Sequence, residues 1–255
     1  MNNNIFERHE LKFLINEWQR RFLEQALRER IVPDPHGEST VCNVYYDTPD
    51  FRLIRASLEK PVYKEKLRLR SYGPALPDEL VFLELKKKYR GIVYKRRISV
   101  TEQEAVDFLN GAAPLPEESQ IGREIDYFVQ FYQDLGPAMY LSYDRAAFFS
   151  REDPDLRVTF DKKIRWRTED LRVTFDKKIR WRTEDLRLSE KPGGASILAP
   201  GQSLMEIKAA DAIPLWLVDL LNEGQIRQIS FSKYGRAYMS MLEGTYKESR
   251  GVLFA

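Results

Sequence analysis

Lys64-Glu65-Lys66-Leu67-Arg68-Leu69-Arg70 carries a basic side chain at every second position, with leucine between the last three of these cations. Alternation with a period of two is typical of a β-strand that has one polar and one apolar face. The stretch therefore predicts a strand with a strongly basic face. One strand cannot bury its apolar face alone, so further strands of the same kind are expected beside it.

The same alternation recurs in other segments, and amphipathic stretches between them predict helices. Thr101 and Glu104 form a capping-box pattern at the start of one helix. No change of composition marks a boundary, so we predict a single α+β domain over residues 1–255, dominated by antiparallel strands. The further strands are expected at 6–15, 81–88, 92–100, 139–149, 156–167, 204–208 and 229–233, and the helices at 16–30, 101–109, 119–135, 214–223 and 233–242.

The composition excludes several classes of protein. Of 255 residues, 43% are apolar and 31% are charged, which suits a folded core and excludes a disordered chain. Cys42 is the single cysteine, so we expect no disulfide framework and a reducing, cytoplasmic compartment. No apolar run approaches the ~20 residues that a transmembrane helix needs. The net charge is only +2, so any affinity for anions must come from charges that are sorted in space.

Residues 155–169 recur without a change at 170–184. Solenoid repeats have longer periods, occur in several copies and diverge, so this pair is a single tandem duplication. A recent in-frame duplication and an artificial one both fit the sequence. Each copy alternates like a strand, and only one is expected to hold the original place in the sheet.

Cations gather on the polar faces of the predicted strands. Ordinary solvated faces mix both signs, because like charges on neighbouring strands repel. A bound polyanion would relieve this repulsion, and a solvated outer face is the alternative interpretation. The cations on these faces are Arg8, Lys12, Lys64, Lys66, Arg68, Arg70, Lys86, Lys88, Lys95, Arg97, Arg145, Arg157, Lys163, Arg165, Arg167, Lys208 and Lys233, and the carboxylates among them are Glu10, Glu84, Asp161 and Glu206.

Two arrangements could use such faces. A flat basic sheet suits nucleic acid, and a closed barrel with its basic face inward suits a compact polyanion such as a phosphate chain. Sheets that bind bases expose aromatic side chains, but Phe13, Phe160 and Trp166 share the apolar faces. The pattern therefore favours phosphates, with the helices packed outside. Glu206 is the best candidate for a divalent metal ligand, and a salt bridge to a neighbouring arginine is the alternative.

Short motifs follow one another along nearly the whole chain. They are Glu7-Arg8-His9-Glu10-Leu11-Lys12-Phe13, Lys66-Leu67-Arg68-Leu69-Arg70, Glu84-Leu85-Lys86, Tyr94-Lys95-Arg96-Arg97, Tyr143-Asp144-Arg145, Leu156-Arg157-Val158-Thr159-Phe160-Asp161, Met205-Glu206-Ile207-Lys208 and Phe231-Ser232-Lys233-Tyr234. In this order the set resembles the VTC domain, the polyphosphate polymerase domain of the triphosphate tunnel metalloenzyme or CYTH-like group. Each motif alone is weak, and the ordered set is more specific.

The resemblance implies an antiparallel eight-stranded closed barrel, a triphosphate tunnel with a basic lumen. It implies transfer of the γ-phosphoryl group of a nucleoside triphosphate to a polyphosphate chain, with Mn²⁺ or Mg²⁺ as cofactor. Arg145 and Arg157 match the spacing of the family's two late arginines and Arg172 does not, which favours the first copy of the repeat as the native strand. The predicted site consists of Lys12, Arg68, Arg70, Lys86, Lys95, Tyr143, Arg145, Arg157 and Lys208 for phosphate, Lys233, Arg145 and Arg157 for catalysis, and Glu206 and Glu10 for metal.

The sequence also departs from relatives of the family. Hydrolytic and cyclase relatives carry Glu-x-Glu-x-Lys in the first strand, where this chain has Arg8, Glu10 and Lys12. Activation of water by a metal needs that acidic wall more than chain transfer does, which weighs against a hydrolase. The alternatives are a tunnel-fold triphosphatase or NTPase and a non-catalytic polyphosphate-binding module. No nucleic acid is expected, because the aromatic side chains share the apolar faces. No membrane span is expected, and the sensing domain and membrane helices of eukaryotic members are not found. The sequence does not indicate which protein partners the chain has.

Overall fold

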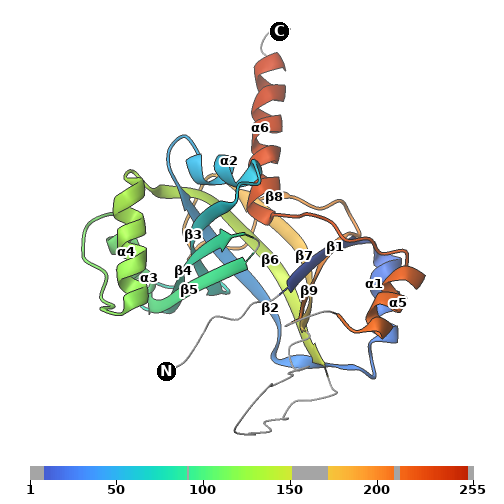
Figure 1. The fold of residues 1–255 in the computed structure, drawn as a ribbon. Coiled ribbons are helices and arrows are strands. Elements are labelled where there is room, and N and C mark those ends of the chain that lie inside the picture. The colour runs from blue at the N-terminus through green and yellow to red at the C-terminus, as the bar shows by residue number, and fades with distance from the viewer. Residues whose placement is uncertain (1–8, 91, 151–171, 210–212, 252–255) are drawn as a thin grey trace, which may run out of the picture. The chain divides into compact units, whose positions relative to one another are not determined.

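The computed structural model describes residues 9–90, 92–150, 172–209 and 213–251 (Figure 1). They form an α+β fold with one large antiparallel sheet, as predicted. The strands are β1 (His9–Ile15), β2 (Ile31–Asp47), β3 (Tyr63–Tyr72), β4 (Leu80–Tyr89), β5 (Ile92–Thr101), β6 (Gly136–Ser150), β7 (Arg172–Arg182), β8 (Ala195–Ser196) and β9 (Ser203–Ala209). The helices are α1 (Glu17–Ala26), α2 (Arg52–Leu58), α3 (Glu102–Leu109), α4 (Gln120–Tyr132), α5 (Leu215–Glu223) and α6 (Lys233–Gly251).

The strands follow the order β1-β9-β7-β6-β2-β3-β4-β5, and β8 pairs with β7. Within the described ranges no pairing joins β1 to β5, so this order is an open path and a closed barrel stays a prediction. None of the helices in these ranges combines the length and the apolar character that a membrane crossing requires.

The described residues belong to two compact units. Unit 1 draws on Met1–Ser39, Asp144–Lys178 and Leu198–Ser230, and unit 2 draws on Thr40–Tyr143, Ile179–Ile197 and Phe231–Ala255. Strands β2, β6 and β7 contribute residues to both units.

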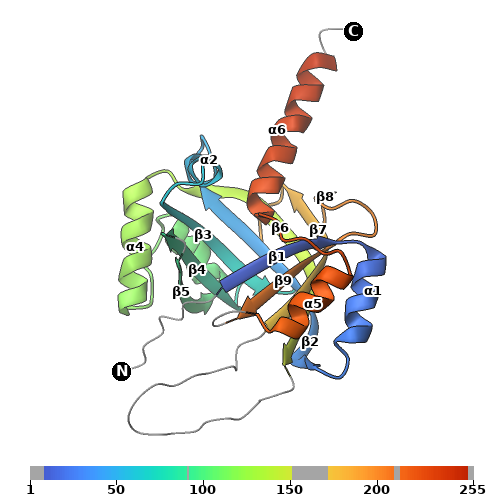
Figure 2. The same cartoon turned by 45° about the vertical axis from the view of Figure 1, so that its right-hand side comes forward.

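In unit 2, helices α3 and α4 cover the apolar face of the β3–β4–β5 strands (Figures 1 and 2). The leucines that alternate with the cations are buried there, which confirms the predicted period of two. The Thr101–Glu104 capping box starts α3 as expected. The core beneath the helices contains Leu67, Leu69, Leu83, Leu85, Ile98, Ala105, Phe108, Ile125 and Phe128. The opposite face of these strands carries the basic side chains.

In unit 1, α1 and α5 pack beside each other on the apolar residues of β1, β7 and β9 (Figure 2). Asn16 caps α1, with a reciprocal bond from Gln19, and the helix ends at Ala26 rather than at residue 30. The core contains Phe13, Ile15, Leu23, Leu27, Val173, Phe175, Met205, Ile207, Leu217 and Leu221. As in unit 2, the helices bury the apolar face of the strands and do not cover their polar face.

The expected strand at 229–233 is wrong. Only an isolated bridge forms near it, between Gln228 and Phe13, and the Ile229 amide donates to the Lys12 carbonyl oxygen. The next element is α6, which begins at Lys233 and runs past the expected end at residue 242. A stretch of so few residues has too little alternation to distinguish a strand from an extended connection.

The second copy of the repeat forms β7, contrary to the expectation that favoured the first. Val173, Thr174 and Phe175 face Ile207, Glu206 and Met205 of β9. The first copy, with Arg157, lies outside the described residues, and the structure does not place that predicted phosphate ligand.

The segment that follows the second copy gives the physical reason for this choice. Arg180 and Trp181 pair directly with Ser196 and Ala195 of β8. Gly194 lies so close to this strand that an added Cβ would stand 2.1 Å from the Trp181 carbonyl oxygen. The strand that ends at Arg182 is thus in continuous contact with residues only a short loop away. If the first copy were used, this packed turn would need an extra 15 residues inside it.

Removing the duplication is expected to stabilise the protein modestly. Because the copies are identical, deleting 155–169 or 170–184 gives the same polypeptide. The connection from β6 to β7 would shorten from the 21 residues of 151–171 to 6, since 15 are removed. Loop-closure entropy then predicts a gain of about 1 kcal/mol in the free energy of unfolding, measured by urea denaturation. A marked loss of stability would mean that both copies hold places in the fold.

Candidate functional site

The polar face of β3, β4 and β5 in unit 2 carries rows of facing side chains. Lys66, Lys86 and Lys95 occupy one row. Arg68, Glu84 and Arg97 occupy the next, and Arg70 faces Phe82 beyond it. Positions two residues apart share a face, so these rows form one surface. Three lysines that face one another across the strands match the predicted excess of positive charge on the polar face.

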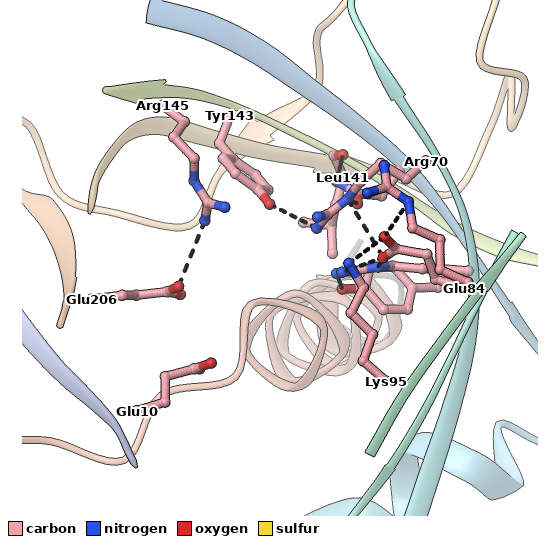
Figure 3. A network of polar contacts seen from close by, with 12 residues as sticks. Glu10, Arg70, Glu84, Lys95, Leu141, Tyr143, Arg145 and Glu206 are labelled. Carbon is pink, nitrogen blue, oxygen red and sulfur yellow. Dashed lines mark hydrogen bonds and ion pairs between the residues drawn. The ribbon is translucent and has the colours of Figure 1, made fainter. Parts of the chain in front are cut away.

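Glu84 lies at the centre of this surface and is 1% exposed (Figure 3). Its Oε2 accepts from Arg68 Nε at 2.8 Å, with Arg68 Nη2 at 2.6 Å. Its Oε1 lies 2.7 Å from Lys95 Nζ and 3.5 Å from Arg97 Nε. Arg70 Nε is 3.8 Å from Oε2. Four positive charges around one negative charge leave a net charge of +3.

The pKa values follow from this crowding. Burial alone would raise the pKa of the Glu84 carboxyl, but Arg68, Arg70 and Lys95 outweigh it and hold that pKa well below its usual range. Burial lowers the pKa of Lys95 to about 8, with Arg68 and Arg70 acting in the same direction and Glu84 opposing them. Glu84 is therefore ionised at neutral pH, and Lys95 is the cation of the group most easily deprotonated.

Arg70 links this cluster to Tyr143 and Lys233 in the same unit. Arg70 Nη2 donates to the Tyr143 hydroxyl at 3.1 Å, and its Nε donates to Asn43 Oδ1 at 2.9 Å (Figure 3). Lys233 Nζ lies 4.7 Å from the centroid of the Tyr143 ring. The predicted catalytic lysine and the predicted phosphate-binding tyrosine are thus in contact, and both adjoin the arginine cluster.

Two side chains next to Lys233 fix the start of α6. The Ser232 hydroxyl accepts from Lys66 Nζ at 3.1 Å. The Tyr234 hydroxyl donates to Asp47 Oδ2 at 2.8 Å, and both residues are buried. The backbone that carries Lys233 is therefore held from both sides by residues of β2 and β3.

Unit 1 holds a second polar group, centred on Arg145. Its Nε donates to Asp176 Oδ1 at 2.7 Å and its Nη2 donates to Oδ2 at 2.8 Å. The same Nη2 is 3.6 Å from Glu206 Oε2 (Figure 3). Thr174 faces Glu206 across β7 and β9, and its buried hydroxyl has no hydrogen-bond partner among the described residues.

Glu10 of β1 contacts two of the predicted phosphate ligands. Its carboxylate is 3.0 Å from Lys12 Nζ and 3.5 Å from Lys208 Nζ. In the described part of the chain, no three His, Cys, Asp or Glu side chains gather into a group that could hold a metal ion. Mg²⁺ often uses only one or two protein carboxylates when phosphates supply other ligands, so the chemistry of Glu206 still fits a predicted metal ligand.

The structure thus distributes the predicted residues between the two units. Sequence reasoning did not assign roles to Glu84, Arg97, Asn43 or Asp176. The register of the predicted strands would have pointed to Arg97, which lies two positions from Lys95 on the same face. Unit 2 brings together Arg68, Arg70, Lys86, Lys95, Tyr143 and Lys233, and unit 1 contains Glu10, Lys12, Arg145, Glu206 and Lys208.

Two solved structures are similar to this chain. One is a protein from Bacillus halodurans provisionally assigned as an adenylate cyclase, 16% identical with a TM-score of 0.49, covering 91% of this chain and 96% of its own. The other, from Vibrio parahaemolyticus and assigned in the same way, is 11% identical with a TM-score of 0.46, covering 91% of this chain and 98% of its own. Similarity at this level supports no inference about activity.

Sequence comparison is more informative. Vacuolar transporter chaperone complex subunit 4 of Trypanosoma cruzi (strain CL Brener) is 27% identical over 170 residues. The match covers 55% of this chain and 21% of that protein, so this chain spans about a fifth of its relative's length. The family model of the VTC domain matches residues 7–242, which include every residue of the basic surface in unit 2 and of the Arg145 group in unit 1. The resemblance carried by the ordered motifs is therefore confirmed, and this chain belongs to the VTC domain family.

Proposed function

We propose that this domain is a polyphosphate polymerase, which transfers the γ-phosphoryl group of a nucleoside triphosphate to a polyphosphate chain. The observation that carries the proposal is the net charge of +3 around Glu84, on a sheet face that also presents a row of three lysines. Such a surface suits a ligand with several closely spaced negative charges. Phosphate oxygens can accept from two nitrogens of one guanidinium, which suits the arginines.

Phosphoryl transfer relies mainly on positioning and on neutralising charge, and needs little covalent chemistry from the protein. The acceptor would be the terminal oxygen of a polyphosphate chain, which is already anionic, so no protein nucleophile or general base is required. In this proposal Arg68, Arg70 and Lys95 bind the phosphates of unit 2's site. Lys233, held over Tyr143, neutralises charge that develops on the transferred group.

Arg97 adds a donor to this site. Its Nε is buried and has no hydrogen-bond partner within the described residues, while its guanidinium lies over the Phe82 ring at 3.2 Å. Because 34% of the Arg97 side chain is exposed, its outer nitrogens can donate to a phosphate oxygen while Nε faces Glu84 Oε1. Arg97 is therefore included in the proposed phosphate-binding set.

The remaining parts of the proposal concern unit 1 and the cofactor. Lys12, Lys208 and Arg145 are proposed to contact phosphates there, with Glu206 as the ligand of Mn²⁺ or Mg²⁺. A bound divalent ion would supply additional neutralisation of phosphate charge. The closed tunnel, the cytoplasmic location and the contribution of Arg157 remain predictions of the same proposal.

Polyphosphate gels test the proposal directly. We expect the protein, incubated with ATP and Mn²⁺, to produce chains that stain as polyphosphate and that a polyphosphatase removes. The Lys233→Ala variant is expected to produce at least about 100-fold less polyphosphate, because the charge of the lysine would be missing in the transition state. Lys88→Ala is the matched control, because Lys88 is a lysine near the end of β4, on the basic face of the sheet. Phosphate release without chain growth would indicate a triphosphatase instead, and tight binding without turnover would indicate a binding module.

A further inference from the structure

Glu84 is an unexpected residue on a surface that binds anions. A buried carboxylate subtracts one charge from the cluster and would repel a phosphate. Desolvating it is also costly unless cations surround it. Simple electrostatics therefore predicts that the site would bind phosphate better without Glu84, and its central place needs another explanation.

The two carboxylate oxygens of Glu84 contact cations on different strands. Oε2 receives both Nε and Nη2 of Arg68, from β3. Oε1 lies against Lys95 and Arg97, from β5. Because Glu84 stands on β4 between these strands, its carboxylate joins cations that would otherwise repel one another. Long cationic side chains lose rotamer freedom when they are fixed, and Glu84 brings about that loss before any ligand arrives.

We propose that Glu84 is a positioning residue, which holds Arg68, Lys95 and Arg97 as one fixed array on the phosphate-binding face. This inference rests on the proposed function, since it concerns the same phosphate site. The array presents its remaining donors to the ligand in a set geometry. Glu84 itself does not contact the phosphate.

The protonation of Lys95 follows from the charged groups that face it. Removing the carboxylate would take away the charge that opposes the effect of burial, and a nearby opposite charge commonly shifts a pKa by one unit or more. The pKa of Lys95, about 8 in the native protein, would then fall below that value. The titratable and charged groups on this face are Tyr45 on β2, Lys64, Lys66, Arg68 and Arg70 on β3, Glu84, Lys86 and Lys88 on β4, Arg97 on β5, Tyr143 on β6 and Lys233 on α6.

Calorimetric titration with tripolyphosphate, at several pH values between about 6 and about 9, tests the inference. Glu84→Gln keeps the shape and removes the charge. It is expected to bind roughly 10-fold more weakly than the native protein near pH 8, and the deficit is expected to narrow toward pH 6, where Lys95 is protonated in both proteins. Tripolyphosphate titrates as well, but that effect is common to all variants and cancels in the ratio of their dissociation constants.

Glu124→Gln is the matched control. Glu124 of α4 contacts Lys87 of β4 and Arg96 of β5, on the opposite face of the sheet, at 3.5 and 3.1 Å. It is expected to leave both the affinity and its pH dependence unchanged. Glu84→Asp retains the charge on a shorter side chain, so it is expected to lose affinity and to shift the pH dependence less than Glu84→Gln does. It also serves as the test if Glu84→Gln fails to fold, as judged by circular dichroism.

The outcomes separate this inference from the function on which it rests. If Glu84→Gln binds as tightly as the native protein or more tightly, Glu84 does not position the cations. If Glu84→Gln keeps the native pH dependence, the carboxylate charge does not control Lys95. If the native protein itself fails to bind tripolyphosphate, the proposed function is at fault.

Discussion

Arg68→Ala is expected to lower kcat/KM for polyphosphate synthesis by about 100-fold or more, the effect of deleting one preorganised donor from a phosphate site. Among the cations around Glu84, Arg68 makes the shortest contact with its carboxylate, at 2.6 Å. It holds Glu84 with two nitrogens, and its Nη1 donates to the Tyr45 hydroxyl at 3.1 Å. Its loss removes a ligand for phosphate and also releases one side of the array around Glu84.

Two further variants serve as controls for the Arg68→Ala result. Arg68→Lys keeps the charge but loses the fork that binds two oxygens, so it is expected to recover only part of the activity. Arg96→Ala removes an arginine of β5 that contacts Glu124 on the opposite face, and is expected to keep nearly full activity. Initial rates over a range of ATP concentrations, with thermal unfolding of each variant, provide the measurement. Equal losses in the Arg68 and Arg96 variants would show that general charge, rather than this surface, supports catalysis.

The sequence predicted most elements that have a local signal. Apolar and polar residues alternate regularly along β3, β4 and β5. Asn16 predicts the cap of α1, and Thr101 with Glu104 predicts the cap of α3. Strand β2 has no such pattern, because Pro33, Pro35 and other turn-forming residues interrupt its first half, and it was not predicted.

Helix α2 was missed for a related reason. Its N-cap is Phe51, in the left-handed region at φ 58° with no side-chain cap. Its first amides are satisfied from upstream instead, by the Thr48 hydroxyl and the Asp47 carboxylate. Such a cap lies outside the positions at which sequence patterns look for one.

The site was predictable as a set of residues but only partly as a set of contacts. Alternation alone placed Arg68, Arg70 and Lys95 on one polar face. The pairing of Arg68 with Glu84 follows from a short hairpin between neighbouring strands, and the register gives it. The bond from Arg70 to Tyr143 joins residues 73 positions apart, and depends on a sheet order that no local pattern contains. The central role of Glu84 emerges only from burial among cations of both neighbouring strands.

Asp47→Ala is expected to produce the largest loss of stability among the variants considered, about 3 kcal/mol or more in the free energy of unfolding. Asp47 is a buried carboxylate that accepts four hydrogen bonds. Its Oδ1 accepts from the amides of Thr48 and Leu53 at 2.9 and 2.8 Å. Its Oδ2 accepts from the Ile54 amide at 3.0 Å and the Tyr234 hydroxyl at 2.8 Å. Alanine would leave buried donors at the start of α2 and on α6 without a partner.

The pKa of Tyr234 supports the same coupling: burial raises it, and the adjacent Asp47 carboxylate raises it further, so the hydroxyl stays a donor to Asp47.

Urea denaturation measures the loss of stability in the Asp47→Ala variant. Asp50→Ala is the control. Asp50 stands in the same turn and contacts Thr48 and Arg55, but it is exposed, so little change in stability is expected. Because Tyr234 adjoins Lys233, the Asp47 variant should also lose polymerase activity under conditions in which it remains folded. If stability falls while activity per folded molecule stays native, the Asp47–Tyr234 bond serves the fold alone, and Lys233 is held in place by the Ser232–Lys66 contact.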